Sequence, residues 1–541
     1  MRKISVALLA ASLAGVSGVA LAQSTPFIID QSRPDRARAK PAPKEAPVTP
    51  LPAEPALAKF KPFALRSVRI ESSSLAPTAL AAATRNFIGK TIDAKTLGDI
   101  AEAVSQAYAE KGDVALYTVA VPQQSFANGT LVLTAVEGYI ERVDLSGDVQ
   151  GRLELVTKYA TRLTKERPLA RSTFQRTISL IRDIPGLAIE AKLLRGNAPG
   201  AVRLLLVLKQ RDWHITLSAD DMGSNPLGRL QGQARASLYG LLREGEETAL
   251  TIGLPLEVGR FQYASLSETQ AIDDNGTSVS AAYGYLRTRP RHPASAGTAN
   301  TLQFLVSHPL LRSYDENLYI TGSIDGIDSS NATLGQIVAD ERIRALRLSA
   351  AYSSTTATSA LAVSASMNFG LNIFGARTTD PLSAETAFKK AVVQASYNRL
   401  LGDGWIARFR VATQLAFCRL PVSELYALGG ANFGSAFASA SAFGDAAFAG
   451  SAELAWRPAG LPGLLNGSEV FGFAEDGGAR YLRRRNFTPR DFQLASAGFG
   501  VRIPFRSQTR LELKAANGIA ADAPGVGAGK WRFGFTLATS P

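Results

Sequence analysis

The sequence has a single cysteine, Cys418, among 541 residues. A disulfide framework is therefore excluded, and a lone thiol in a strand-like pattern indicates a small packing residue rather than a nucleophile. Histidine is almost as scarce, and His214, His292 and His308 are too far apart in the sequence for metal-ligand spacing. These shortages predict a protein without a metal site, a cofactor or a thiol nucleophile.

Long hydrophobic runs are missing as well, except at the N-terminus. Two basic residues there precede a mainly apolar run over residues 4–14, and the small-residue triplet Ala20-Leu21-Ala22 follows. This order predicts a signal peptide over residues 1–22 that is cleaved before Gln23. A membrane-anchoring helix is the alternative, but the run is interrupted by glycine and serine and is short for a span of ~20 residues. No later segment offers ~18 consecutive apolar residues, so the exported protein is expected to be soluble or a barrel.

Dense positive charge and catalytic motifs are also lacking. The net charge of +13 is spread along the chain, which argues against a nucleic-acid partner. Residues 525–530 superficially resemble a phosphate loop, but Trp531 replaces the required Ser or Thr, so a hairpin loop is expected. Asp325, Asp328 and Asn331 could contact a divalent ion in an outer loop, but a turn is favoured because no set of ~6 oxygen ligands accompanies them. The sequence predicts that the protein is not an enzyme.

Changes in composition divide the rest of the chain. Residues 23–63 form an expected Pro-rich basic linker, because prolines interleaved with Arg and Lys cannot pack a core. Two compact α/β modules are expected next, at residues 64–139 and 140–212. Residues 213–541 then show almost no convincing amphipathic helix, which predicts a mainly β region.

The two modules share one plan, β-α-α-β-β. In the first module we expect strands at residues 65–70, 115–121 and 130–136, a turn at Asn128-Gly129, and a helix with Leu97, Ile100, Ala101, Val104 and Tyr108 on one face. In the second we expect strands at residues 140–145, 187–194 and 201–209, and a helix that carries Phe174, Ile178 and Ile181. Small three-stranded sheets of this kind leave an open edge, which can accept an extended segment of another chain.

Alternation with period two dominates the C-terminal region. One face of a strand is expected to carry Phe409, Val411, Thr413, Leu415 and Phe417, and the other Arg408, Arg410, Ala412, Gln414 and Ala416. A membrane barrel needs an apolar outside and a polar inside, which this pattern supplies. The four tryptophans, Trp213, Trp405, Trp456 and Trp531, fall near expected strand ends, where interfacial girdles would place them. At ~20 residues per strand and loop, about 16 strands are predicted; a soluble β-sandwich or propeller remains the alternative.

Several motifs resemble a known family. The first module contains Val121-Pro122-Gln123-Gln124, Asn128-Gly129 and Ala135-Val136-Glu137-Gly138. With these residues it resembles the first POTRA module of the two-partner secretion transporters, the haemolysin secretion/activation family of the ShlB, FhaC and HecB type. The resemblance assigns the POTRA motif to Pro122, Gln124, Gly129, Glu137 and Gly138. Further matches, in the family's order, are Arg167-Pro168-Leu169, Asp183-Ile184-Pro185-Gly186, Asp220-Asp221-Met222-Gly223, Gly228, Gly444-Asp445 and residues 449–454.

The resemblance covers roughly residues 64–541 and implies two POTRA modules followed by a sixteen-stranded antiparallel transmembrane β-barrel. It implies a Gram-negative outer-membrane protein with periplasmic POTRA modules, which secretes an unfolded exoprotein through the barrel. Implied partners are the N-terminal secretion domain of that exoprotein, outer-membrane lipid and lipopolysaccharide, and the barrel assembly machinery. An assembly factor that inserts other barrels or moves lipid is the alternative, although such relatives usually carry more POTRA modules.

In the family, one loop folds back into the barrel and carries Val-Arg-Gly-Tyr or Val-Arg-Gly-Phe. Its arginine reaches a strand motif of the form Phe-x-Asp-x-Gly. The resemblance assigns the loop motif to Gly429, Gly430, Phe433, Gly434, Ser435, Ala436 and Phe437. It assigns the strand motif to Phe473, Glu475, Asp476 and Gly477.

This chain departs from the family at that contact. Ser435 stands where the family has its arginine, and the aspartate is either replaced by Glu475 or displaced to Asp476. Because a serine hydroxyl replaces neither the charge nor the fork of a guanidinium, we expect a more loosely held loop and a channel that opens more readily. The alternative is that Phe433 and Phe437 seat the loop by packing while another arginine, such as Arg480, pairs with the carboxylate.

Three other departures concern the ends of the chain and the start of the barrel. Only residues 23–31 precede the proline-rich stretch, so a plug helix like that of many family members is in doubt. The chain ends Thr539-Ser540-Pro541 instead of in an aromatic residue, so the assembly machinery would bind weakly or use Phe535. Asp221 stands where the family usually has Asn.

Overall fold

The computed structural model describes residues 62–541, apart from 123, 127, 150–152, 222, 224–226, 291–294, 334–335, 431–432, 485–487, 506–507, 524 and 541. The expected signal peptide, almost all of the expected linker and the segment considered for a plug helix lie outside the described residues. The described chain divides into two compact units, residues 62–210 and 211–541. None of the helices within these ranges is long and apolar enough to cross a membrane.

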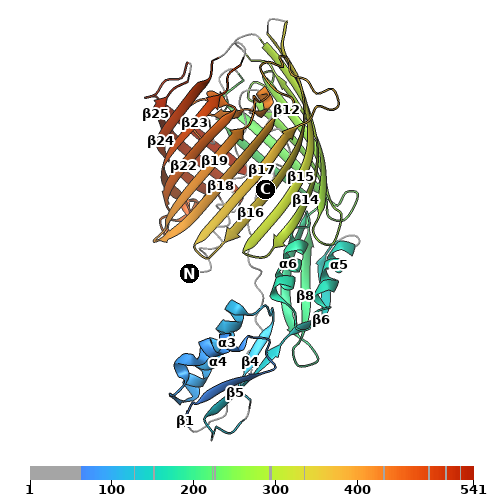
Figure 1. Ribbon diagram of the computed structural model, residues 1–541, viewed down its shortest axis with the longest axis vertical. Coiled ribbons are helices and arrows are strands. Elements are labelled where there is room, and N and C mark those ends of the chain that lie inside the picture. The colour runs from blue at the N-terminus through green and yellow to red at the C-terminus, as the bar shows by residue number, and fades with distance from the viewer. Residues whose placement is uncertain are drawn as a thin grey trace. The chain divides into compact units, whose positions relative to one another are not determined.

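The first module has the expected β-α-α-β-β order (Figure 1). Its elements are β1 (Phe63–Ala64), β2 (Ser67–Glu71), α3 (Pro77–Thr84), the 3-10 helix η1 (Arg85–Phe87), β3 (Thr91–Ile92), α4 (Ala94–Lys111), β4 (Tyr117–Ala120) and β5 (Thr130–Glu137). The main sheet has the order β2-β5-β4, with β2 and β5 parallel and β5 and β4 antiparallel. Asp93 begins α4 by accepting a hydrogen bond from the amide of Thr96 at 2.8 Å, which lowers the pKa of its carboxyl.

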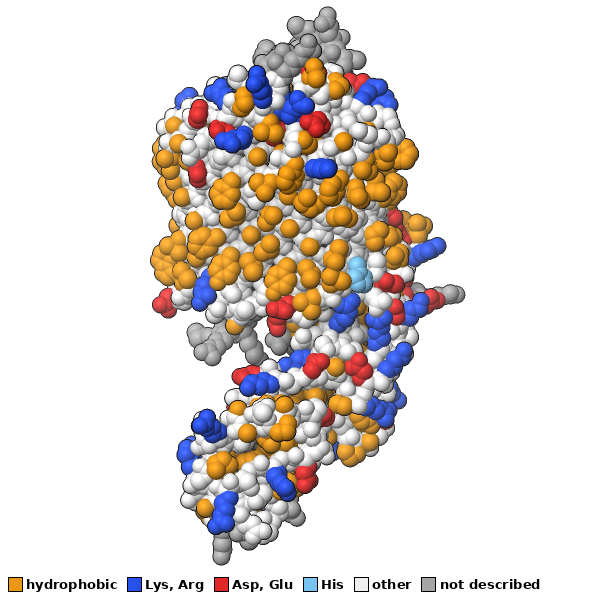
Figure 2. Space-filling view, in the orientation of Figure 1, with side chains coloured by type: hydrophobic (Ala, Val, Ile, Leu, Met, Phe, Trp, Pro, Cys, Tyr) orange, Lys and Arg blue, Asp and Glu red, His pale blue; other side chains and the backbone are white. Residues whose placement is uncertain are grey.

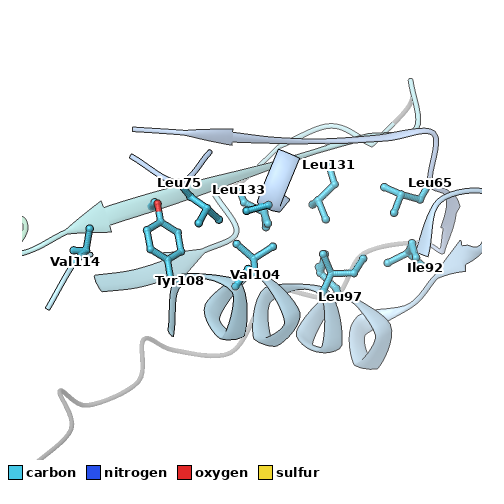
Figure 3. Close-up of a cluster of buried hydrophobic side chains, with 13 residues drawn as sticks. Leu65, Leu75, Ile92, Leu97, Val104, Tyr108, Val114, Leu131 and Leu133 are labelled. Carbon is cyan, nitrogen blue, oxygen red and sulfur yellow. The ribbon is translucent and has the colours of Figure 1, made fainter. Parts of the chain in front are cut away.

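One face of α4 packs on this sheet. Leu97, Val104 and Tyr108 project from the helix toward Leu131 and Leu133 of β5, and all five side chains are fully buried (Figure 3). Their spacing follows the helical and strand periods that place side chains on one face. The helical face expected from the sequence is therefore confirmed.

The second module repeats the plan. Its elements are β6 (Tyr139–Asp148), α5 (Glu154–Leu163), α6 (Arg171–Arg182), β7 (Leu187–Arg195) and β8 (Ala201–Gln210), and its sheet has the order β6-β8-β7. Phe174, Ile178 and Ile181 of α6 are buried, as expected. In both modules the last strand is central, so the two outer strands each have one strand neighbour among the described residues.

Two reciprocal caps join the modules. Arg171, at the start of α6, donates a hydrogen bond from Nη2 to the carbonyl oxygen of Tyr108 at 2.9 Å, near the C-terminal end of α4. Asp113, just after α4, accepts from the amide and the hydroxyl of Ser172 in the first turn of α6, at 2.9 and 2.8 Å. A cation at a helix C-terminus and a carboxylate at a helix N-terminus are both stabilised by the helix dipole. The joint therefore satisfies the end of one helix and the start of the next.

The second unit is a closed, antiparallel, sixteen-stranded barrel. Its strands are β9 (Trp213–Asp220), β10 (Gln231–Tyr239), β11 (Glu246–Pro255), β12 (Phe261–Ala271), β13 (Ser278–Thr288), β14 (Ser295–Arg312), β15 (Glu316–Thr333), β16 (Gln336–Thr355), β17 (Ser359–Gly370), β18 (Lys389–Gly402), β19 (Trp405–Ala416), β22 (Ala446–Trp456), β23 (Glu469–Tyr481), β24 (Arg490–Phe505), β25 (Thr509–Ala521) and β26 (Trp531–Thr539). Strand β26 pairs with β9 and closes the ring. The expected fold class and strand number are confirmed.

Side chains alternate between the two faces of the barrel wall. In β19 Phe409 and Val411 are exposed on the outside, whereas Arg408 and Gln414 are buried on the inside. Figure 2 shows the outward hydrophobic side chains as a broad belt across the face of the barrel in view, with most charged residues toward its two ends. This distribution suits a wall that faces lipid outside and polar groups inside. All four tryptophans lie at strand ends, as expected.

Two expectations about loops have different outcomes. Residues 525–530 lie between β25 and β26, which confirms a loop. Asp325, Asp328 and Asn331 lie within β15, so their placement in an outer loop was wrong. Strand β15 is 18 residues long and carries these polar residues inside a ladder with β16, where Asp325 pairs with Arg347.

Candidate functional site

The long connection between β19 and β22 folds into the barrel. It contains the 3-10 helix η2 (Val422–Glu424) and a short hairpin of β20 (Tyr426–Leu428) and β21 (Ala442–Gly444). Its buried side chains pack on inward-facing alanines and leucines of the wall strands. This cluster comprises Leu428, Phe433, Phe437 and Ala442 of the connection, and Ala412, Ala447, Ala449, Ala479 and Leu494 of the wall. We call residues 417–445 the inner loop.

Glycines in the wall make room for the inner loop. A Cβ added at Gly477 would lie 2.8 Å from Cδ2 of Leu428, and one at Gly518 would lie 2.9 Å from the ring of Phe437. Such distances are shorter than atoms tolerate without displacement. Gly477, assigned to the strand motif from the sequence, therefore serves close packing against the loop.

The tip of the inner loop turns on glycines. Gly429, Gly430 and Gly434 all have positive φ, which side chains rarely adopt. The amides of Gly429 and Gly430 donate to the carbonyl oxygens of Phe433 and Gly434, at 3.0 and 3.2 Å. Because this turn is closed, the amides that follow it point away from the loop and toward the wall.

A buried carboxylate from the wall receives these amides. Oε2 of Glu475, in β23, accepts hydrogen bonds from the backbone amides of Gly434 at 3.0 Å and Ser435 at 2.8 Å. The hydroxyl of Ser496 in β24 donates to the same oxygen at 3.1 Å. Successive backbone amides that converge on one anion form a nest, and charge-assisted hydrogen bonds of this kind are the stronger ones. The loop tip is thus bound through its backbone rather than through an arginine.

Cations of the wall surround this contact. Nη2 of Arg410, in β19, lies 3.6 Å from Oε1 of Glu475, and its guanidinium lies 5.6 Å from the ring centre of Phe433. Nζ of Lys514, in β25, donates to the hydroxyl of Ser435 at 2.8 Å. Two barrel strands thus supply positive charge at the loop tip.

The structure decides between the two carboxylates considered from the sequence. Glu475 faces the loop, whereas Asp476 is exposed on the outside and accepts from the side-chain amide of Gln493 at 3.0 Å. Arg480, considered as the replacement arginine, pairs with Asp491 on the outside at 2.7 Å and does not reach the loop. Successive residues of a strand point to opposite faces, so Glu475 and Arg480 lie on opposite faces of β23. The alternation of β19 predicts that Arg410 lies on the face opposite Phe409, but no sequence motif indicates that Arg410 or Lys514 contacts the loop.

Other contacts hold the base and the far side of the tip. Asp445, which ends the loop, is fully buried, pairs with Arg484 at 2.8 Å, and accepts from the amides of Leu420 and Leu482 at 2.7 and 2.8 Å. Arg532 of β26 donates to the carbonyl oxygen of Phe437. Ala436 packs partly buried on the same cluster.

The first and last barrel strands meet at Asp221. Its Oδ1 accepts from the amide of Phe535 in β26 at 2.9 Å, and its Oδ2 lies 3.2 Å from Nη2 of Arg229. A neutral asparagine at this position could accept the first hydrogen bond but would lack the charge that pairs with Arg229.

The POTRA motif residues build the first module. Oε1 of Glu137 accepts from the amide and hydroxyl of Ser74, at 2.5 and 2.8 Å, and from the hydroxyl of Tyr108 at 2.9 Å. Burial raises the pKa of Tyr108 to about 12. The side chain of Gln124 exchanges two hydrogen bonds with the backbone of Val132, at 2.7 and 2.8 Å.

The glycines and the proline of the motif serve close approaches and a turn. A Cβ at Gly129 would lie 2.6 Å from the carbonyl oxygen of Ala64, and one at Gly138 would lie 2.9 Å from Cβ of Leu116. The carbonyl oxygen of Pro122 accepts from Gln124 at 3.3 Å. Gln123 lies outside the described residues.

Comparison with family models tests the resemblance. Residues 202–503 match the model of the haemolysin secretion/activation protein ShlB/FhaC/HecB. Residues 63–138 match the model of the POTRA domain, ShlB-type. The chain belongs to the ShlB/FhaC/HecB family. As in this family, the barrel lies in the outer membrane and the POTRA modules lie in the periplasm.

Individual members and neighbours of the family agree with this. The Heme/hemopexin transporter protein HuxB of Haemophilus influenzae (strain ATCC 51907 / DSM 11121 / KW20 / Rd) is 23% identical over 267 residues, which cover 46% of each chain. The chain thus spans about half the length of the curated relatives that it matches. CdiB from Escherichia coli has the same fold with a TM-score of 0.68 at 15% identity, covering 92% of this chain and 94% of that one. CdiB from Acinetobacter baumannii has a TM-score of 0.61 at 14% identity, covering 100% and 99%.

Proposed function

We propose that the chain is a translocator that binds an unfolded exoprotein through its POTRA modules and secretes it through the barrel. The observation that carries the proposal is the inner loop, which is held inside the barrel by residues built into the wall strands. A few polar contacts hold this loop against the wall. If those contacts break, the loop can move and the channel can open while the wall strands stay paired.

The site residues receive their roles within this proposal. Gly429, Gly430 and Gly434 shape the tip, Phe433 and Phe437 pack it, and Ser435 offers an amide and a hydroxyl. Glu475 is the acceptor that keeps the tip in place. The chemistry is binding and release, so we propose that the protein is not an enzyme and needs no cofactor.

The domain boundaries belong to the same proposal. We assign residues 1–22 to a signal peptide, 23–63 to a linker, 64–139 and 140–212 to the POTRA modules, and 213–541 to the barrel. The barrel assembly machinery, outer-membrane lipid and lipopolysaccharide are the proposed partners in the membrane. The exoprotein is the proposed partner of the POTRA sheets, which offer outer strands for strand addition.

The test uses a deletion and a defined cargo. A gene for a long, β-rich exported protein is expected beside the gene for this chain, and its N-terminal domain is the cargo. Deletion of residues 64–212 should abolish cargo binding while the barrel still inserts and remains heat-modifiable on gels. Secretion of the cargo at normal yield by the isolated barrel would contradict the proposal. Loss of other outer-membrane proteins, with no effect on the cargo, would instead support an assembly factor.

A further inference from the structure

The inner loop meets the wall at a second place, far from its tip. Glu424, the last residue of η2, is 1% exposed. Its Oε1 accepts from Nη2 of Arg347 in β16 at 2.8 Å, and its Oε2 lies 2.8 Å from Nζ of Lys390 in β18. Neither Arg347 nor Lys390 takes part in the contacts of the loop tip.

The place that receives Glu424 is built by consecutive wall strands. Arg347 also pairs with Asp325 of β15, at 2.5 and 3.1 Å, and donates to Asn368 of β17 at 3.2 Å. The side chain of Gln414, in β19, donates to the carbonyl oxygen of Glu424 at 3.1 Å. Each of the strands β15 to β19 therefore contributes at least one polar side chain to this cluster, and those of Asp325, Asn368, Lys390 and Gln414 are buried.

A second carboxylate of the wall lies at the start of η2. Glu341, in β16, is buried beside the backbone amides of Val422 and Ser423. These are the first amides of the 3-10 helix, which have no partner within it. The same part of the wall therefore adjoins both ends of the helix.

Glu424 is the carboxylate that the loop supplies to this cluster. It pairs with both Arg347 and Lys390, whereas Asp325 of the wall pairs with Arg347. Departure of η2 would break both ion pairs of Glu424 inside the barrel. Removing one partner of a buried ion pair is strongly unfavourable, so the wall itself opposes the departure of η2.

We propose that Glu424 is a second anchor of the inner loop, a positioning residue that must leave Arg347 and Lys390 before the loop can vacate the barrel. The tip is bound by β23 to β26 and by Arg410 of β19, whereas η2 is bound by residues of β15 to β19. The two anchors lie on either side of the strands from which the loop emerges, so release of the tip alone leaves the first half of the loop in place. This inference rests on the proposed translocation function for its purpose, but not for its test.

The test reads the position of η2 without any cargo. Ser423 is buried, so a Ser423→Cys reporter in a Cys418→Ser background should react slowly with a membrane-impermeant maleimide. Adding Glu424→Gln should raise the labelling rate roughly tenfold or more, because one member of a buried ion pair has lost its charge. The matched control is Asp491→Asn, which removes the exposed pair with Arg480 at 2.7 Å on the outside of the barrel and should leave labelling unchanged.

A double variant separates anchoring from charge balance. Glu424→Gln with Lys390→Met removes one charge of each sign, so the net charge of the cluster is unchanged and the barrel should fold and stay heat-modifiable even if the single variant does not. If Glu424 is an anchor, labelling stays fast in this double variant. Slow labelling in the double variant would show that Glu424 only balances charge, and slow labelling in both variants would likewise overturn the proposal. Neither result depends on secretion, so failure of the anchor and failure of the translocator are told apart.

Discussion

The buried hydroxyl of Ser435 accepts a hydrogen bond from the ammonium group of Lys514, with 2.8 Å between Nζ and Oγ. Ser435 is 1% exposed, so this contact leaves little space around the hydroxyl. An arginine at position 435 would bring its guanidinium beside Lys514 and near Arg410. The wall therefore already supplies positive charge beside position 435, so an arginine introduced there should be repelled.

The first prediction concerns this replacement. The loosely held loop expected from the sequence implies that Ser435→Arg suppresses channel openings. The structure instead predicts that Ser435→Arg increases them, because like charges at a buried site repel. Ser435→Arg combined with Lys514→Ser should bring openings back toward the native frequency. Single-channel recordings in planar bilayers measure both. Fewer openings in Ser435→Arg alone would support the sequence-based hypothesis of a loosened contact.

A second prediction uses two adjacent carboxylates. Glu475→Gln should weaken the binding of the loop tip, because hydrogen bonds to a charged acceptor contribute about 1.5–3 kcal/mol and the pairing with Arg410 is lost. Asp476→Asn is the control, since Asp476 faces outward. Open probability should rise in the first variant only. Equal behaviour of the two would show that the amides of Gly434 and Ser435 do not hold the loop through Glu475.

Two neighbouring glycines give a third prediction. Gly477→Ala puts a methyl group 2.8 Å from Leu428, whereas in Gly478→Ala the nearest atom is the carbonyl oxygen of Phe492 at 3.8 Å. Overpacking typically costs about 1–3 kcal/mol, so Gly477→Ala should displace the inner loop and increase openings. Gly478→Ala should behave like the native protein in the same recordings. A silent Gly477→Ala would mean that Leu428 moves aside freely.

The fourth prediction concerns the stability of the first POTRA module. Tyr108→Phe removes the hydroxyl that bonds Glu137 and Ser73 inside the core, and should lower the free energy of unfolding by about 1–3 kcal/mol. Tyr117→Phe, which removes one hydrogen bond to the carbonyl oxygen of Ser105, should cost less. Denaturant unfolding of residues 62–210 compares them. A larger loss of unfolding free energy in Tyr117→Phe than in Tyr108→Phe would show that the hydroxyl of Tyr108 is not the main polar contact of this core.

Much of the fold could be predicted because its signals are local and periodic. The alternation around Phe409 marks a barrel strand, and the spacing of Leu97 and Tyr108 marks a helix. Residues such as Asp325 were misplaced because strand length depends on how far neighbours extend, and β14 to β16 are unusually long. No local pattern reports that length.

The candidate site was only half accessible from the sequence. The sequence motifs located the loop tip and Glu475. Arg410, Lys514 and Glu424 lie in segments that come together only when the barrel closes. The alternation of each strand indicates that Arg410 and Lys514 face inward. It does not indicate which of the inward faces a loop contacts. Pairings across a barrel depend on closure and register, which a single sequence does not specify.

The reciprocal caps at Asp113 and Arg171 have a consequence for how a translocator of the proposed kind would hold its cargo. Because the joint satisfies both helix ends, the two modules form a spacer of fixed length rather than a flexible tether. The outer strands β4 and β7 are then kept at one separation. Two segments of an exoprotein that bind them together gain effective concentration only when the intervening chain matches that separation. The two POTRA modules would thereby select an exoprotein by the spacing between its two binding segments as well as by their sequences.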